Sequence, residues 1–128
     1  MSEVTILVLR DTIIVPIQVE LDDETALKLR ESILAKIEKT GAKGLIIDIS
    51  SVSLIDTFLG RILLETAEMA KLMGCATVLA GMRKEVVISL IYLGLNLKGL
   101  NTALNLEHGL EMLESLKAGM LMSPGDKT

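Results

Sequence analysis

The chain has 128 residues, half of them hydrophobic, which fits one domain built around one core. It contains one Phe, one Tyr and no Trp, and its net charge is −4 with scattered basic residues, so it lacks the aromatic and basic features of a nucleic-acid-binding surface. Its one cysteine cannot form an intrachain disulfide, the N-terminus does not resemble a signal peptide, and no apolar run approaches the ~20 residues of a membrane span. These features predict a soluble, cytoplasmic protein.

Strand and helix patterns alternate along the chain. Two β-branched runs around a polar turn predict an N-terminal hairpin, and Pro16 in the second run predicts a bulge or a partly edge position there, because proline cannot donate to a strand ladder. Acids before an apolar stripe and a glycine after it mark the start and end of the first helix. The predicted elements are, in chain order, strands over 4–9 and 13–21, a helix over 22–41, a strand over 44–50, a helix over 57–73, a strand over 75–81, a helix over 83–93, a weak strand over 100–104 and a helix over 106–116.

This order predicts an α/β fold with a mixed, mainly parallel sheet of four to five strands and about four helices. We expect one domain over residues 1–118 and a flexible C-terminal tail over 119–128. Two helices carry apolar bands wider than one sheet face requires, which indicates either a deeper core or a partner surface. The bands comprise Leu59, Leu63, Ala67, Ala70 and Met73, widened by Phe58, Ile62 and Met69, and on the next helix Val86, Val87, Leu90, Ile91 and Leu93.

Few residues follow the pattern of a metal or catalytic site. His108 lies near the start of the last predicted helix and is expected to face solvent, and Cys75 opens an apolar strand and is expected to be a buried, inert thiol. The sequence has no phosphate-binding loop, dinucleotide fingerprint or nucleophile elbow. An enzyme would have to build its site from scattered Asp, Glu and Ser residues.

The pair Asp56-Thr57, at the end of the loop between the third predicted strand and the second helix, is the most polar point of an apolar region. Ser50, Ser51 and Ser53 lie on the same loop, and such loops form the ligand-facing edge of parallel α/β sheets. The Thr57 hydroxyl fits two roles. It caps the helix, or it accepts a phosphate, which the free N–H groups of a helix N-terminus would stabilise. A phosphate would add nearly two negative charges beside Asp56 without melting the helix.

Three segments give the chain a resemblance to a known family. LIIDISSVSLIDTFLGRIL, GCATVLAGMRKEVVISLIYLGL and TALNLEHGLEML resemble the central motif, the next strand and helix, and the last segment of the STAS domain, named for sulfate transporters and anti-sigma factor antagonists. The resemblance covers the chain from Val4 to Leu116. Within the family, VELDDETALKLRESILAKIEKTGAKG and AKLMGCATVLAG are most similar to the single-domain scaffold subunits of the stressosome, the RsbS type.

The resemblance implies a non-enzymatic scaffold, without a cofactor, that assembles with RsbR-type STAS sensor paralogues into a large complex. Such a complex holds a serine/threonine switch kinase of the RsbT type, which on stress phosphorylates the scaffold and leaves, and a separate phosphatase resets the site. The motif assigns the phosphorylation to Thr57, with Asp56 and Ser53 as neighbours on the switch loop. The family usually has Ser at this position, so the kinase's preference for Thr is an open question, and Ser50, Ser51 and Ser53 are fallback acceptors.

Three other interpretations stay open at this point. A free anti-sigma factor antagonist would bind an anti-sigma kinase directly and use the same Thr57. An enzyme or a small-molecule binder would use the same loop and depend on Asp56. A purely structural scaffold would never be modified at all. The size of the assembly separates the first of these from a stressosome subunit.

Overall fold

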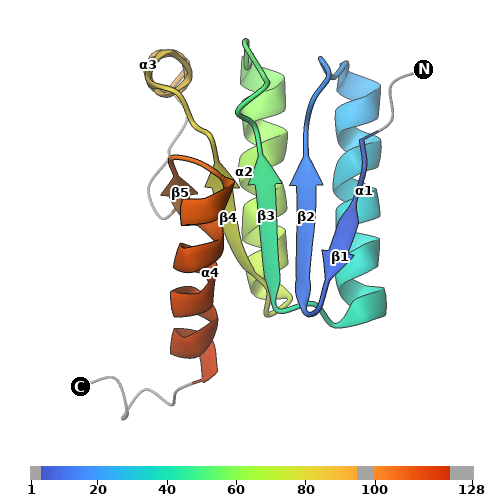
Figure 1. Cartoon of the computed structure of the whole chain (residues 1–128). Coiled ribbons are helices and arrows are strands. Elements are labelled where there is room, and N and C mark those ends of the chain that lie inside the picture. Colours follow the sequence, from blue (N-terminus) through green and yellow to red (C-terminus); the bar gives the residue numbers. More distant parts are fainter. Residues whose placement is uncertain (1–3, 95–99, 122–128) are drawn as a thin grey trace.

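The computed structural model describes residues 4–94 and 100–121, in the predicted α/β order (Figure 1). Its elements are, in chain order, β1 (Leu7–Leu9), β2 (Thr12–Pro16), α1 (Asp23–Thr40), β3 (Gly44–Asp48), α2 (Thr57–Leu72), β4 (Ala76–Ala80), α3 (Lys84–Tyr92), β5 (Thr102–Ala103) and α4 (Leu106–Leu121). The five strands form one sheet in the order β1-β2-β3-β4-β5. β1 is antiparallel to β2 and the other neighbours are parallel, which confirms the mixed, mainly parallel sheet.

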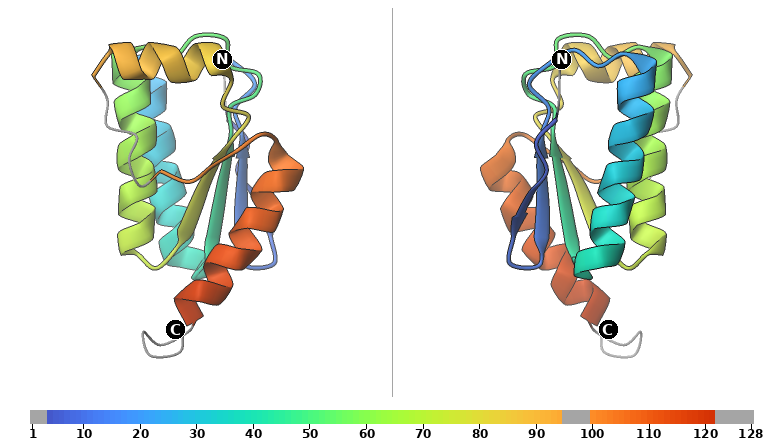
Figure 2. Two further views of the ribbon diagram at one scale, coloured as in Figure 1. Left: turned by 90° about the vertical axis from the view of Figure 1, so that its left-hand side faces the viewer. Right: turned by 90° about the vertical axis from the view of Figure 1, so that its right-hand side faces the viewer.

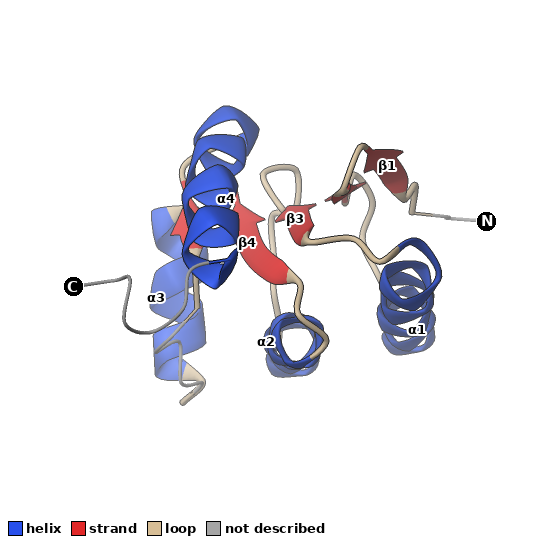
Figure 3. Cartoon of the chain, turned by 90° about the horizontal axis from the view of Figure 1, so that it is seen from below, coloured by secondary structure: helices blue, strands red, loops and turns tan. Residues whose placement is uncertain are grey.

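The helices cover the sheet unequally. Seen from below, α1 and α2 lie on one face and α4 lies on the other (Figure 3). α3 lies across the end of the sheet at which the parallel strands stop (Figure 2). That end therefore carries α3, the start of α1 and α2, and the loops that lead into them.

The predicted caps of α1 and α4 are confirmed. The Asp22 carboxylate accepts a hydrogen bond of 2.8 Å from the amide of Thr25 at the start of α1, and Gly41 ends that helix at φ 67°. Asn105 caps α4 by accepting from the amide of His108 at 2.9 Å. Local capping residues therefore set both ends of α1 and the start of α4.

α4 is longer than predicted. It runs to Leu121, whereas the sequence pattern predicts an end near Leu116 and a tail from 119. Lys117 explains part of the difference, because its ammonium group contacts the Asp11 carboxylate at 2.9 Å and holds the later turns of the helix against the β1–β2 turn. The proposed boundary at residue 118 stays a prediction.

Pro16 lies where β2 becomes an edge. The β1 ladder reaches β2 only as far as the pair Leu7 and Ile14, while the β3 ladder continues to the pair Pro16 and Asp48. The next amide, that of Ile17, donates to the Asp48 carbonyl of β3 at 2.9 Å. Since successive amides of a strand point to opposite sides, the missing donor of Pro16 faces the side that β1 has left. This confirms a partly edge position, without a bulge in the β3 ladder.

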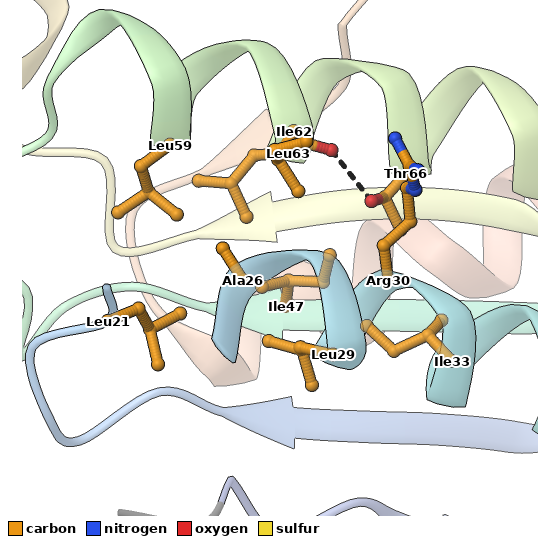
Figure 4. A pocket seen from close by; sticks show the side chains of 10 residues that line it. All are labelled: Leu21, Ala26, Leu29, Arg30, Ile33, Ile47, Leu59, Ile62, Leu63 and Thr66. Carbon is orange, nitrogen blue, oxygen red and sulfur yellow. Dashed lines mark hydrogen bonds between the residues drawn. The ribbon is translucent and has the colours of Figure 1, made fainter. Parts of the chain in front are cut away.

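Buried apolar side chains form one group on each face of the sheet. The larger group lies between the sheet and helices α1 and α2, and includes Ile33, Ile47 and Leu63. The smaller lies under α4, and includes Ile46 and Leu113. A cavity of about 10 Å³ between α1, α2 and β3 has room for no more than a water molecule (Figure 4).

The apolar bands of α2 and α3 are only partly buried. Met73, predicted on the buried face of α2, is 42% exposed, because the helix ends before it. Thr66 is buried instead, and its hydroxyl donates to the Ile62 carbonyl at 2.7 Å (Figure 4). On α3, Ile91 and Leu93 are 61% and 43% exposed. Part of each predicted apolar band therefore lies outside the core. Such exposed apolar side chains are typical of a surface that contacts a partner.

Candidate functional site

The loop between β3 and α2, residues 49–56, lies at the carboxyl end of the sheet (Figure 1). The amide of Ile49 continues the β3–β4 ladder by donating to the Ala80 carbonyl at 2.9 Å. Val52 and Ile55 are each 2% exposed and anchor the loop in the core, whereas Leu54 is 68% exposed. The loop is therefore an ordered segment with apolar anchors and an outward-facing surface.

The loop between β4 and α3 holds this segment in place. The Arg83 guanidinium, at the start of α3, donates to the Val52 carbonyl at 2.8 Å. Gly81 packs so closely that a Cβ atom there would lie 2.6 Å from the Cβ of Ser50 and 2.7 Å from its backbone. Arg83 and Gly81 are about 30 residues away in the chain, and no local sequence pattern connects them to the loop, so the sequence does not predict these contacts.

Two of the four candidate hydroxyls are already engaged. Ser50 donates from its amide and its hydroxyl to the Asp48 carboxylate, at 3.0 Å and 2.8 Å, in a local turn. The Ser53 hydroxyl donates to the Glu20 carboxylate on the loop before α1 at 3.3 Å. Ser51 is exposed. The side chains of Ser50 and Ser53 therefore have structural roles within the loop.

Asp56, not Thr57, caps α2. Asp56 has the extended backbone of a cap residue, and its carboxylate accepts from the amide of Leu59 at 2.8 Å. Thr57 is already the first helical residue, so the assignment of the cap to its hydroxyl is wrong. The half-buried Thr57 hydroxyl makes no hydrogen bond with any residue that the structure describes.

The start of α2 keeps unused backbone donors beside Thr57. The first intrahelical bond runs from the amide of Gly60 to the Asp56 carbonyl at 2.9 Å, and Leu59 donates to the Asp56 side chain. The amides of Thr57 and Phe58 precede these bonds and have no carbonyl of the helix to donate to. Within the described part of the chain, the Thr57 hydroxyl thus lies unpartnered beside two free amides and the Asp56 carboxylate.

The remaining candidates lie away from this loop. His108 is exposed in the first turn of α4, and Cys75 is fully buried, as predicted. Burial raises the pKa of the Cys75 thiol to about 11, so the thiol stays protonated at neutral pH. Within residues 4–94 and 100–121, no cluster of three His, Cys, Asp or Glu side chains could hold a metal ion. No helix in the same residues is long and apolar enough to span a membrane.

Comparisons with known proteins identify the family of this chain. The model of the STAS domain matches residues 3–108. A serine-to-glutamate variant of RsbS from Moorella thermoacetica is 39% identical, with a TM-score of 0.82 over 91% of this chain and 99% of that one. A chain in a structure of the stressosome, which is described as a signal integration and transduction hub, is also 39% identical. Its TM-score is 0.77 over 88% of this chain and 97% of that one.

The curated relatives are longer proteins. RsbRA of Bacillus subtilis strain 168, an RsbT co-antagonist protein, is 26% identical over 88% of this chain but only 41% of its own length. This chain therefore spans about two fifths of that relative. The phosphorylated form of the Bacillus cell fate determinant SpoIIAA shares the fold, with a TM-score of 0.65 at 16% identity. The chain belongs to the STAS domain family, and within it resembles the RsbS protein of the stressosome.

Proposed function

We propose that this chain is a non-enzymatic scaffold subunit of a stressosome-type complex. It assembles with RsbR-type paralogues, holds a serine/threonine switch kinase of the RsbT type, and releases the kinase when Thr57 is phosphorylated. The released kinase starts a general stress response, and a separate phosphatase resets the scaffold. Likeness to RsbS and to a stressosome chain at 39% identity supports the scaffold role, and the matches to RsbT co-antagonist proteins support the choice of partners.

The observation that carries the proposal is the state of the Thr57 hydroxyl. Ser50 and Ser53 donate their hydroxyl hydrogens to carboxylates, whereas Thr57 has no such partner among the described residues. Thr57 is also the first residue of α2, at the carboxyl end of the sheet, and its side chain is half-buried. A kinase would not have to break an internal hydrogen bond to reach Thr57. Loss of its hydroxyl hydrogen would leave the loop unchanged.

The chemical step is a phosphoryl transfer. The γ-phosphoryl group of ATP moves to Thr57 Oγ1, ADP leaves, and the hydroxyl proton passes to a base of the kinase. The free amides of Thr57 and Phe58 support the new anion, while the Asp56 carboxylate stays on the amide of Leu59. The fold is therefore kept, and the carboxyl end of the sheet gains about two negative charges. A kinase bound over this loop would be repelled by the new charge.

Phosphosite mapping tests the proposal directly. The chain is incubated with its switch kinase, ATP and magnesium, and the products are mapped by mass spectrometry beside a Thr57→Ala variant. We expect one phosphate on Thr57 that is absent from the variant. Phosphate on Ser50, Ser51 or Ser53 alone, or no phosphate, would contradict the assignment of Thr57.

Kinase affinity tests the release. Phosphorylation should weaken binding of the kinase at least tenfold, an effect of about 1.4 kcal/mol that one close like-charge contact can supply. An unchanged affinity would contradict release by charge. Sizing chromatography with an RsbR-type paralogue separates the two STAS roles, since a scaffold forms a very large complex. A free anti-sigma factor antagonist, the alternative function, would stay small under the same conditions.

A further inference from the structure

Arg61 lies one helical turn after Thr57 on α2. Residues four apart on a helix share a face, with Cβ atoms about 5–6 Å apart, so the two side chains are neighbours. Arg61 is exposed and makes no ion pair with any residue in the described part of the chain. A free guanidinium therefore stands beside the free hydroxyl of Thr57.

The next turn of α2 explains why Arg61 has no acid to pair with. Its own neighbour four residues on is Glu65, the position at which a helix usually forms an ion pair. The Glu65 carboxylate is already bound by Arg30 of α1 at 2.9 Å, and the Arg30 side chain is 18% exposed. Among the described residues, Glu65 thus pairs with Arg30 of α1 and not with Arg61.

Three charged groups around the loop between β3 and α2 have hydrogen-bond partners. Arg83 donates to the Val52 carbonyl, Glu20 accepts from Ser53, and Asp56 accepts from the amide at the start of α2. A phosphate on Thr57 would meet one negative charge next to it in sequence, that of Asp56. Arg61 is the cation on the same helix face that can offset both charges.

We propose that Arg61 binds the phosphate carried by Thr57. The inference rests on the proposed modification of Thr57 and adds the residue that holds the modified state. An anion four residues before a cation is the favourable order on a helix, and a guanidinium donates two parallel hydrogen bonds to phosphate oxygens. Phosphorylation then changes two features of the surface at once. It adds an anion, and it pairs a cation that was free to contact the kinase.

The test does not need the kinase. Phosphothreonine is incorporated at position 57 by genetic code expansion, and the second pKa of its phosphate is followed by ³¹P NMR. A nearby guanidinium favours the dianion, so Arg61→Gln should raise this pKa by about half a unit, and Arg61→Lys should raise it less. Lys71→Gln is the matched control, because it removes the same charge from an exposed position at the far end of α2.

The control defines the outcome that overturns the inference. Equal pKa values in wild-type, Arg61→Gln and Lys71→Gln chains would mean that Arg61 does not contact the phosphate. Thermal unfolding of each variant shows that the fold is kept, which we expect since both side chains are exposed. Because the phosphate is introduced without the kinase, this failure is distinct from a failure of the kinase to modify Thr57.

Discussion

The two ends of the sheet are built in different ways. At the amino end, the Asp11 carbonyl accepts from the amides of Lys43 and Gly44, at 2.8 Å and 3.2 Å, and the Asp11 carboxylate binds Lys117 of α4. Tight turns and one ion pair close that end. At the carboxyl end, a loop of eight residues is held by two buried apolar side chains and by single hydrogen bonds from Arg83 and to Glu20, and it leads into Thr57, whose hydroxyl has no hydrogen-bond partner among the described residues.

This difference separates stability from signalling. The amino end joins β1, β2 and β3 through backbone bonds and α4 through the ion pair of Lys117 with Asp11, so a chemical change there would alter the fold. At the carboxyl end, side-chain hydrogen bonds surround Thr57, whose own hydroxyl makes no hydrogen bond with the described residues. A group can be added to Thr57 without removing a contact that the described residues make. The four predictions below test this separation, starting with the largest expected effect.

Gly81→Ala should be the most damaging change at the carboxyl end. Gly81 has φ 82°, and a new Cβ would lie 2.7 Å from backbone atoms of Ser50. The loop between β3 and α2, residues 49–56, would therefore have to move. We expect a loss of about 3 kcal/mol in the free energy of unfolding, measured with urea. Gly74→Ala is the control, since Gly74 has φ 83° but open space around it, and should cost about 1–2 kcal/mol. Equal losses would show that the loop does not depend on Gly81.

Asp56→Ala tests the observed cap of α2. Removing the carboxylate leaves the amide of Leu59 without its partner, and loss of such a cap typically costs about 1 kcal/mol. Asp56→Asn keeps an oxygen at the same place and should lose only a fraction of this. Urea unfolding of the two variants gives the comparison. A variant with Asn that is as unstable as the one with Ala would indicate that charge, not the hydrogen bond, matters here.

Lys117→Met tests the amino end through its pH dependence. The hydrogen bond from Lys117 holds the pKa of Asp11 below its usual value, so this pair stabilises the fold above the unfolded pKa of about 4. The contribution is lost as the pH falls through the lower, folded pKa. We expect Lys117→Met to cost about 0.5–1 kcal/mol at pH 7, because Asp11 is half exposed, and the cost to shrink in acid.

Lys43→Met is the control for that prediction. Lys43 is exposed at the same end of the sheet, and its side chain makes no ion pair with any residue the structure describes. Its replacement should change stability by less than about 0.5 kcal/mol at either pH. A difference between wild-type and Lys117→Met chains that stays constant down to pH 3 would contradict a role for the Asp11 charge.

Local signals in the sequence predict the helices and strands but not the contacts that shape the loop between β3 and α2. Asp22 and Gly41 mark the ends of α1 correctly, because caps depend on residues within one turn. Val52 is tied to Arg83 31 residues later, and Ser53 to Glu20 33 residues earlier. Such contacts arise only when the strands are ordered side by side, so no periodicity within one element reports them.

The same limit explains two errors of interpretation. The sequence places the end of α4 too early, because the contact of Lys117 with Asp11 spans 106 residues. It assigns the cap of α2 to Thr57, because Asp and Thr are both good caps and a pattern cannot decide between adjacent residues. The sequence singles out Thr57 by the family motif and by its place at the start of a helix, whereas the hydrogen bonds that engage Ser50 and Ser53 are seen only in the structure.

Thr57→Ala should have the smallest effect on stability. The hydroxyl has no hydrogen-bond partner among the described residues, and alanine is a better helix former than threonine, so the free energy of unfolding should change by less than about 0.5 kcal/mol. A loss as large as that of Asp56→Ala would mean that the hydroxyl does cap the helix. It would also weaken the case for phosphorylation, since modification would then disturb the fold. If Thr57→Ala leaves the free energy of unfolding unchanged and Asp56→Ala lowers it, the two adjacent residues have different roles. Asp56 then stabilises the start of α2, and the Thr57 hydroxyl is available to a kinase.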